Sequence, residues 1–180
     1  MIYKRTLSGK WTFDCPVMKG KGKKRFGDCF KVSAPVATLL NEAFLIQDFQ
    51  ECGKWIEKNG YLLEKNGLHP SASPKSKQSN TDTYIIFPYY YDQGGYHRYS
   101  EEEFSEKFPG IKSYLQQFKW KLLKRDVDEK CQWFEYGRSQ ALAHINQEKL
   151  LLSTLITGKV KYYRLDSETV PHSEKPERRS

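Results

Sequence analysis

The sequence has few cysteines and methionines and no long apolar run. It contains 4 Cys and 2 Met in 180 residues, and no two cysteines stand at the spacing of zinc ligands. We therefore expect no metal site and interpret the cysteines as reduced, mostly buried residues. No stretch approaches the ~18 consecutive apolar residues of a membrane span, and no apolar region of a signal peptide follows the first five residues. These absences predict a cytoplasmic protein without a membrane partner.

Recognisable catalytic motifs are missing as well. The chain has no G-x-S-x-G elbow, no Walker loop and no glycine fingerprint for a nucleotide cofactor. The paired acids Glu101, Glu102 and Glu103 stand where a helix is expected to begin, and helix capping explains them better than acid–base chemistry does. We therefore predict no catalytic residue and no cofactor in this chain.

Positive charge is concentrated near the N-terminus. The whole chain carries a formal charge of +8. Residues 1–35 contain nine basic and two acidic residues, a net charge of +7, and residues 19–25 alone contain five bases and two glycines. A local basic field attracts polyanions, most often nucleic acid, although a merely solubilising surface would have the same composition.

Apolar patterning predicts an α+β fold, with mixed or antiparallel sheet segments and a few helices. Ser100 with Glu103 forms a capping box, and Pro109 suits the first turn of a longer helix. An apolar stripe at helical spacing makes 109–125 the longest predicted helix. Its residues are Ile111, Tyr114, Leu115, Phe118 and Leu122.

The remaining patterns define the expected domain. Strands are predicted from apolar runs at 35–40, 43–46, 84–87 and 149–156, and a strand leading into a turn at 131–140. The first two runs would also fit a buried helical turn, and residues 49–63 fit either sheet or a short helix. Residues 66–83 contain one large apolar residue, which indicates a flexible loop. We expect a single domain over 1–165 and a polar C-terminal tail over 166–180.

Polar turns rich in aromatic residues supply the candidate nucleic-acid contacts. Arginine can bind guanine edges through two hydrogen bonds, glutamine can bind adenine, and serine can bind phosphate or base. Many of these tyrosines could equally be half-buried residues of a sheet. The predicted DNA-binding residues are Lys21, Lys23, Lys24, Arg25, Arg98, Tyr136, Arg138, Ser139 and Gln140.

Four segments follow one another in a characteristic order. They are Phe26–Val32 continued by Val36–Ile46, then Ile85–Tyr89, then Phe108–Asp126, and finally Trp133–Gln140 followed by Lys149–Leu151. This order resembles the target-recognition domain of bacterial adenine-specific DNA methyltransferases of restriction–modification systems. The final segment, Trp-Phe-Glu-Tyr-Gly-Arg-Ser-Gln, is similar to the recurrent motif of that domain. One departure is Ala34-Pro35, which stands where the family usually has a glycine.

The resemblance implies a target-recognition-domain-like fold and a sequence-specific DNA recognition module with double-stranded DNA as its partner. Methyl transfer to adenine needs an Asn- or Asp-Pro-Pro-aromatic loop and a glycine-rich loop for S-adenosylmethionine. Neither is present, so the resemblance implies a non-catalytic portion of the enzyme. S-adenosylmethionine would then bind a catalytic methyltransferase domain upstream in the full-length protein or on another chain.

Two other functions fit the same sequence. One is a general nucleic-acid-binding domain, which would bind all duplexes equally. The other is a non-enzymatic interaction domain, whose basic residues would serve solubility and which would have no affinity for duplex DNA at low salt.

Overall fold

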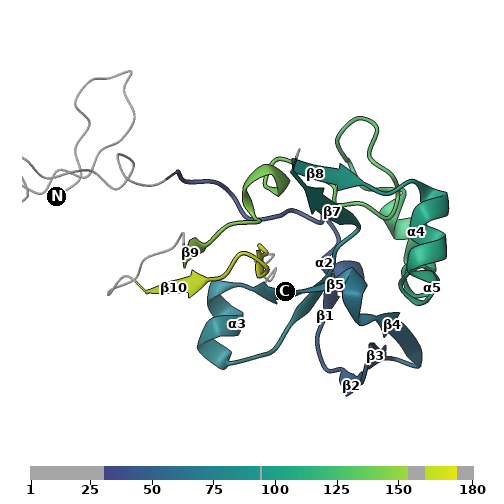
Figure 1. Ribbon diagram of the computed structural model, residues 1–180, viewed down its shortest axis with the longest axis horizontal. Helices are drawn as coiled ribbons and strands as arrows, with labels where there is room; N and C mark the ends of the chain where they lie inside the picture. The colour runs from purple at the N-terminus through teal and green to yellow at the C-terminus, as the bar shows by residue number, and fades with distance from the viewer. Residues whose placement is uncertain (1–30, 94, 154–160, 174–180) are drawn as a thin grey trace, which may run out of the picture. The chain divides into compact units, whose positions relative to one another are not determined.

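The computed structural model describes residues 31–93, 95–153 and 161–173. Contacts divide the chain into two compact units, residues 1–33 and 34–180. This division differs from the predicted boundary at 165/166. All of the helices and strands below belong to the second unit (Figure 1). Among the described residues, no helix is long and apolar enough to cross a membrane.

A four-stranded sheet joins segments from both ends of the second unit. Strands β1, β6 and β5 are antiparallel neighbours, and β11 lies parallel to β5 at the edge. In spatial order the strands are β1 (Leu45–Ile46), β6 (Tyr84–Ile86), β5 (Leu68–Ala72) and β11 (Val170–Pro171).

Seven further strands form a three-stranded meander and two hairpins, all antiparallel. In the meander, the two-residue loop Asn59-Gly60 joins β3 to β4, with both residues at positive φ (52° and 81°). This is the conformation that a tight hairpin of type I′ needs. The meander consists of β2 (Gln50–Cys52), β3 (Trp55–Lys58) and β4 (Tyr61–Glu64). The hairpins are β7 (Tyr89–Asp92) with β8 (Gly95–Arg98), and β9 (Lys149–Leu152) with β10 (Tyr162–Leu165).

Short helices complete the α+β fold that the sequence predicts. The predicted capping box is present: Ser100 Oγ accepts from the Glu103 N–H at 3.1 Å, and the Glu103 carboxylate accepts from the Ser100 N–H at 2.8 Å. The α-helices are α2 (Asn41–Phe44), α3 (Pro74–Ser79), α4 (Glu101–Lys107), α5 (Pro109–Gln116) and α6 (Lys119–Leu122). Two 3₁₀ turns are η2 (Lys65–Gly67) and η3 (Leu142–His144).

The single helix predicted over 109–125 is wrong, because the structure breaks it into α5 and α6. The Phe118 N–H donates to the Leu115 carbonyl, a tighter i→i−3 bond that ends the α-helical ladder. The half-buried Phe118 ring then packs against Tyr114 at 5.5 Å between ring centroids. The predicted apolar stripe is nonetheless largely buried, and Ile111, Tyr114 and Leu115 are at most 2% exposed.

Helix α5 is fixed to β4 by a buried carboxylate. Glu64 accepts hydrogen bonds from the Gly110 N–H (2.7 Å) and the Ile111 N–H (2.9 Å), which are unpaired donors of the first helical turn. A Cβ on Gly110 would lie 2.0 Å from the Leu62 carbonyl oxygen. Only glycine therefore allows this approach of helix and strand.

Residues 66–83, which the composition predicts to be a flexible loop, instead contain the end of η2, strand β5 and helix α3. Strand β5 pairs with β6 on one side and β11 on the other, so backbone hydrogen bonds supply what its side chains lack. Helix α3 begins at Pro74, and a capping box between Ser73 and Ser76 satisfies its first N–H groups. The composition of this stretch reveals neither the strand pairing of β5 nor the capping box of α3.

The predicted polar tail also contains ordered structure. Val170 and His172 are buried at 2% and 3% exposure. The His172 N–H donates to the Ala72 carbonyl at 3.0 Å, and the Val36 N–H donates to the Pro171 carbonyl at 3.0 Å. Pairing with distant strands therefore orders residues whose composition resembles a tail.

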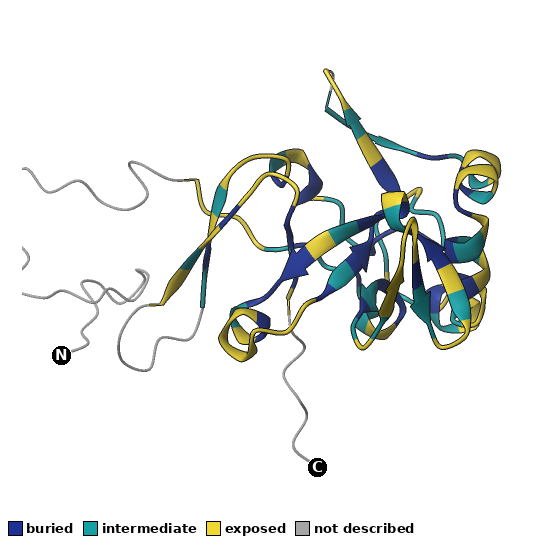
Figure 2. Ribbon diagram, turned by 60° about the horizontal axis from the view of Figure 1, so that its bottom comes forward, coloured by how far each residue is buried: buried dark blue, intermediate teal, exposed yellow. Residues whose placement is uncertain are grey.

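The largest fully buried side chains of the second unit are aromatic, and Figure 2 marks the buried positions along its strands and helices. Phe104 and Phe134 stack at 4.4 Å between centroids, and Tyr136 meets Phe44 edge to face at 5.4 Å. Residues 131–140, predicted as a strand and turn, form turns with one isolated bridge, Ala37 to Arg138. The core therefore anchors this segment mainly through side chains.

The expectation of mostly buried cysteines fails at Cys52, which is exposed, while Cys131 is half-buried. Both are free thiols, and burial raises the pKa of Cys131 to about 11. Cys15 and Cys29 lie outside the described residues.

Candidate nucleic-acid interface

One arginine, Arg125, holds the backbone of the 131–140 segment in place. The Arg125 guanidinium donates to the carbonyls of Trp133 (2.8 Å), Glu135 (3.0 Å) and Thr38, and its Nε donates to the Leu122 carbonyl at 3.0 Å. Burial lowers the pKa of Arg125. Because one guanidinium satisfies carbonyls from three segments, Arg125 fixes the position of the turn.

Aromatic side chains anchor the same segment from within the core. Tyr136 is 1% exposed, its hydroxyl donates to the Ile86 carbonyl at 2.7 Å, and its N–H donates to the Tyr89 hydroxyl at 2.9 Å. A Cβ on Gly137 would lie 2.4 Å from Leu39 Cδ1. The structure therefore gives Tyr136, a predicted DNA contact, a place in the core.

We expect Tyr136→Phe to lower the free energy of unfolding by about 1–2 kcal/mol, because the buried Ile86 carbonyl loses its donor. DNA affinity of the folded variant should be unchanged. Urea denaturation and a duplex-binding titration would measure the two effects. If Tyr136→Phe had normal stability but reduced affinity for duplex DNA, Tyr136 would contact DNA after all.

Beyond Tyr136, the chain displays three of the predicted contacts at the surface. Arg138 makes ion pairs with Asp126 (3.0 Å) and Asp128 (3.5 Å). The Ser139 N–H and hydroxyl both donate to Asp128 Oδ2, and these bonds lower the pKa of Asp128. Gln140 is exposed. The segment that Arg125 and Tyr136 fix in place therefore presents three consecutive polar side chains at the surface.

The structure also brings Arg98 to this segment. From β8, its Nη1 donates to the Lys130 carbonyl at 3.1 Å and lies 3.5 Å from Glu135 Oε2. Glu135 is 1% exposed and burial raises its pKa, although its Oε2 also accepts from the Gln132 N–H. The other four predicted residues, Lys21, Lys23, Lys24 and Arg25, lie outside the described residues.

We call residues 126–140 the polar turn. It carries four acidic residues and two basic ones, a net charge of −2. Its one arginine, Arg138, thus lies beside two carboxylates, and the side chain of one of them, Asp126, is 97% exposed. The polar turn offers hydrogen-bonding groups suited to base edges, but it does not itself supply a positive field for phosphates.

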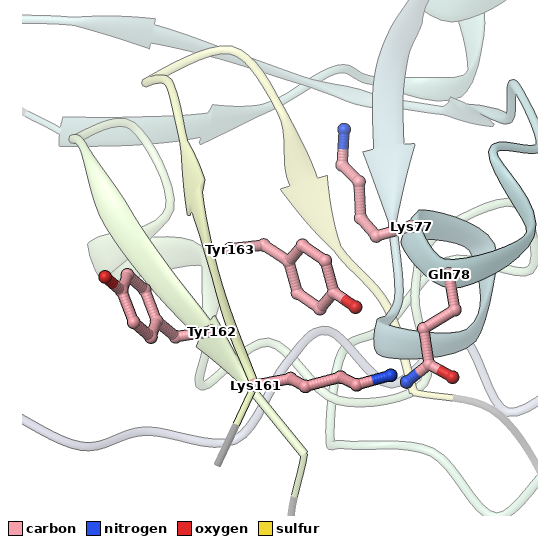
Figure 3. A pocket seen from close by; sticks show the side chains of 5 residues that line it. All are labelled: Lys77, Gln78, Lys161, Tyr162 and Tyr163. Atoms are coloured by element: carbon pink, nitrogen blue, oxygen red, sulfur yellow. The ribbon is translucent and has the colours of Figure 1, made fainter. Parts of the chain in front are cut away.

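Sequence reasoning missed a basic and aromatic cleft on other elements. It has a volume of about 500 Å³, is open to solvent, and lies between α3 and the start of β10 (Figure 3). The run Lys161-Tyr-Tyr-Arg164 was the signal available in the sequence. The cleft residues are Lys77, Gln78, Lys161, Tyr162 and Tyr163.

A smaller cavity of about 160 Å³ lies beside β5 and is mostly apolar. It contains His69, whose pKa is lowered by burial and whose Nδ1 lies 3.1 Å from the Glu168 carbonyl. Within the described residues, no three His, Cys, Asp or Glu side chains are grouped to hold a metal. A single half-buried histidine does not make a catalytic site.

Helix α6 presents a third surface. Trp120 and, just beyond the helix, Leu123 are 59% and 64% exposed. The ammonium groups of Lys121 and Lys124 lie 5.6 and 5.1 Å from the Trp120 ring centroid. An exposed tryptophan is a residue type enriched at the energetic centres of protein–protein contacts.

Comparison with known proteins found no family model that matches this chain and no curated protein that matches it. Its function therefore has to be inferred from the residues and contacts described above.

Proposed function

We propose that this chain is the sequence-specific DNA recognition module of an adenine-specific DNA methyltransferase in a bacterial restriction–modification system. The observation that carries the proposal is the polar turn. It displays Arg138, Ser139 and Gln140 on a backbone segment that Arg125 and Tyr136 fix in place. Base readout requires polar side chains in fixed positions on a rigid scaffold.

The chemistry of the displayed residues suits base edges. An arginine fork can donate to guanine O6 and N7, and a glutamine amide can pair with adenine N6 and N7. The ion pair of Arg138 with the exposed Asp126 is of the weak surface type, so the guanidinium can exchange it for a base at little cost.

The same proposal assigns the methyl transfer to a separate catalytic domain that binds S-adenosylmethionine. That domain would flip the target adenine out of the duplex, and this module would determine where it does so. The expected compartment is the cytoplasm, where a bacterial chromosome is accessible.

Binding-site selection from a pool of random duplexes tests the proposal. We expect one motif to be enriched, and Arg138→Ala to reduce the preference for it by about 1–3 kcal/mol, or roughly 5- to 150-fold, at one base pair. Stability should change by less than about 1 kcal/mol because the ion pairs of Arg138 are at the surface.

The control is Lys124→Ala, which removes one positive charge from an exposed position just after α6 and should leave the preference unchanged. Equal binding of all duplexes by the unmodified chain would favour a general nucleic-acid-binding domain. An Arg138→Ala variant with unchanged preference and unchanged stability would remove that residue from the recognition surface.

The alternative of an interaction domain has one observation in its favour, the exposed Trp120 and Leu123. Absence of any duplex binding at low salt would make it the leading explanation. Under the recognition-module proposal, Trp120→Ala should leave duplex affinity unchanged.

A further inference from the structure

The cleft between α3 and β10 combines cationic, aromatic and amide groups from two elements far apart in the sequence. In Figure 3, Tyr163 points from β10 toward α3, and the Lys161 ammonium lies near the Gln78 amide. Tyr162 points away from them on the other face of the strand and is 67% exposed. Strand alternation explains this division.

The two lysines of the cleft keep their charge available. Neither Lys77 nor Lys161 has a carboxylate within ion-pair distance among the described residues, and both are exposed. Nearby cations are already engaged: Arg164 pairs with Glu148 at 2.6 Å, and Lys149 donates to the Asp166 and Thr169 carbonyls. The cleft lysines can therefore accept an external anion without breaking an internal contact.

No acidic side chain counters this charge from the elements that form the cleft. Residues 74–79 and 161–164 contain four basic residues and no acidic residue. The polar turn, in contrast, has a net charge of −2. Because phosphate contacts supply most of the affinity of DNA-binding proteins, a surface other than the polar turn has to provide them.

The shape of the cleft excludes a small buried ligand. Pockets for small molecules enclose most of the ligand surface, whereas this cleft is open to solvent. A chain-like polyanion that lies across the opening fits better, with phosphates on the ammonium groups and hydrogen bonds from the Tyr163 hydroxyl and the Gln78 amide.

We infer that this cleft binds the sugar–phosphate backbone of double-stranded DNA, independently of sequence. The inference rests on the proposed function and assigns part of its phosphate contact to Lys77 and Lys161. Base choice by the polar turn and backbone binding by the cleft are then separate properties of one chain.

The test is a salt titration of duplex affinity with the full 180-residue chain, comparing it with Lys77→Gln/Lys161→Gln. Each phosphate contact contributes about 0.9 to the slope of log K against log salt, so the double variant should lose about 1.8. Between about 50 and 200 mM salt, the unmodified chain should then lose about 12-fold more affinity than the variant. The loss should be equal for the selected motif and for unrelated duplexes.

Two matched double variants distinguish the location of the cleft lysines from the number of charges removed. Lys54→Gln/Lys124→Gln removes the same charge from the β2–β3 turn and from the end of α6 and should keep the original slope. Lys77→Arg/Lys161→Arg should also keep it, because the charge stays in place.

If Lys77→Gln/Lys161→Gln and Lys54→Gln/Lys124→Gln had the same salt slope of duplex affinity, the cleft assignment would be overturned. The proposed function would still stand in that case if the selected motif were preferred. Loss of affinity for single-stranded oligonucleotides alone would likewise overturn the assignment to duplex DNA. Failure of the unmodified chain to bind any duplex would instead refute the proposed function.

Discussion

Replacement of Arg125 by methionine should lower the free energy of unfolding by about 3–4 kcal/mol, because several partly buried carbonyls lose a charged donor at once. The affected carbonyls belong to Thr38, Leu122, Trp133 and Glu135. Methionine has a similar length and fills part of the space, so the loss measures hydrogen bonding more than packing. Equilibrium denaturation in urea gives the value.

Arg125→Lys and Lys124→Met are the controls for this change. Lysine keeps the charge but lacks the planar fork that reaches several carbonyls, so an intermediate loss is expected. Lys124 is exposed next to Arg125 in the sequence, and its replacement should have little effect. If Arg125→Met unfolded no more easily than Lys124→Met, the carbonyl contacts would not hold the polar turn in place.

The same variant connects the fold to the proposed function. Under conditions where Arg125→Met remains folded, the polar turn would lose its fixed position, and the preference for the selected motif should decrease. The salt slope should stay the same, since the cleft lies on other elements. Loss of slope with retained preference would contradict this separation.

Neutralisation of Lys21, Lys23, Lys24 and Arg25 by glutamine should reduce the salt slope of DNA binding by about 3–4 units, since four phosphate contacts each contribute about 0.9. Between about 50 and 200 mM salt, this corresponds to a difference of roughly 60- to 250-fold in the loss of affinity. The preference among sequences should remain, because phosphate contacts carry no sequence information.

A control with the same net charge removes four exposed lysines of the second unit: Lys54, Lys107, Lys119 and Lys124. A general effect of net charge would make both fourfold variants equal. An unchanged slope after neutralisation of the 21–25 cluster would exclude that segment from the interface.

Local signals in the sequence were sufficient for several elements. The Ser100–Glu103 capping box and the strand predicted at 84–87, found at 84–86, follow from patterns among near neighbours in the chain. The dipeptide Asn59-Gly60 is an equally strong local hairpin signal, and it favours sheet over helix for the residues on either side of it.

Pairing between distant segments accounts for the failures. Strand β5 and residues 170–172 are ordered by hydrogen bonds to each other, and neither has the apolar pattern of a strand. No window of sequence contains such information, because the partners lie elsewhere in the chain.

For the candidate site, the sequence determined the residue types: the basic 19–25 segment, the aromatic and polar 131–140 segment, and the α+β class. Only the tertiary structure decided which of these side chains face solvent. It placed Tyr136 in the core, surrounded Arg138 with carboxylates, and brought Lys77 and Lys161 to one cleft. The physical reason is that composition fixes the available charges and hydrogen-bonding groups, whereas packing between distant elements decides which of them are already satisfied inside the molecule.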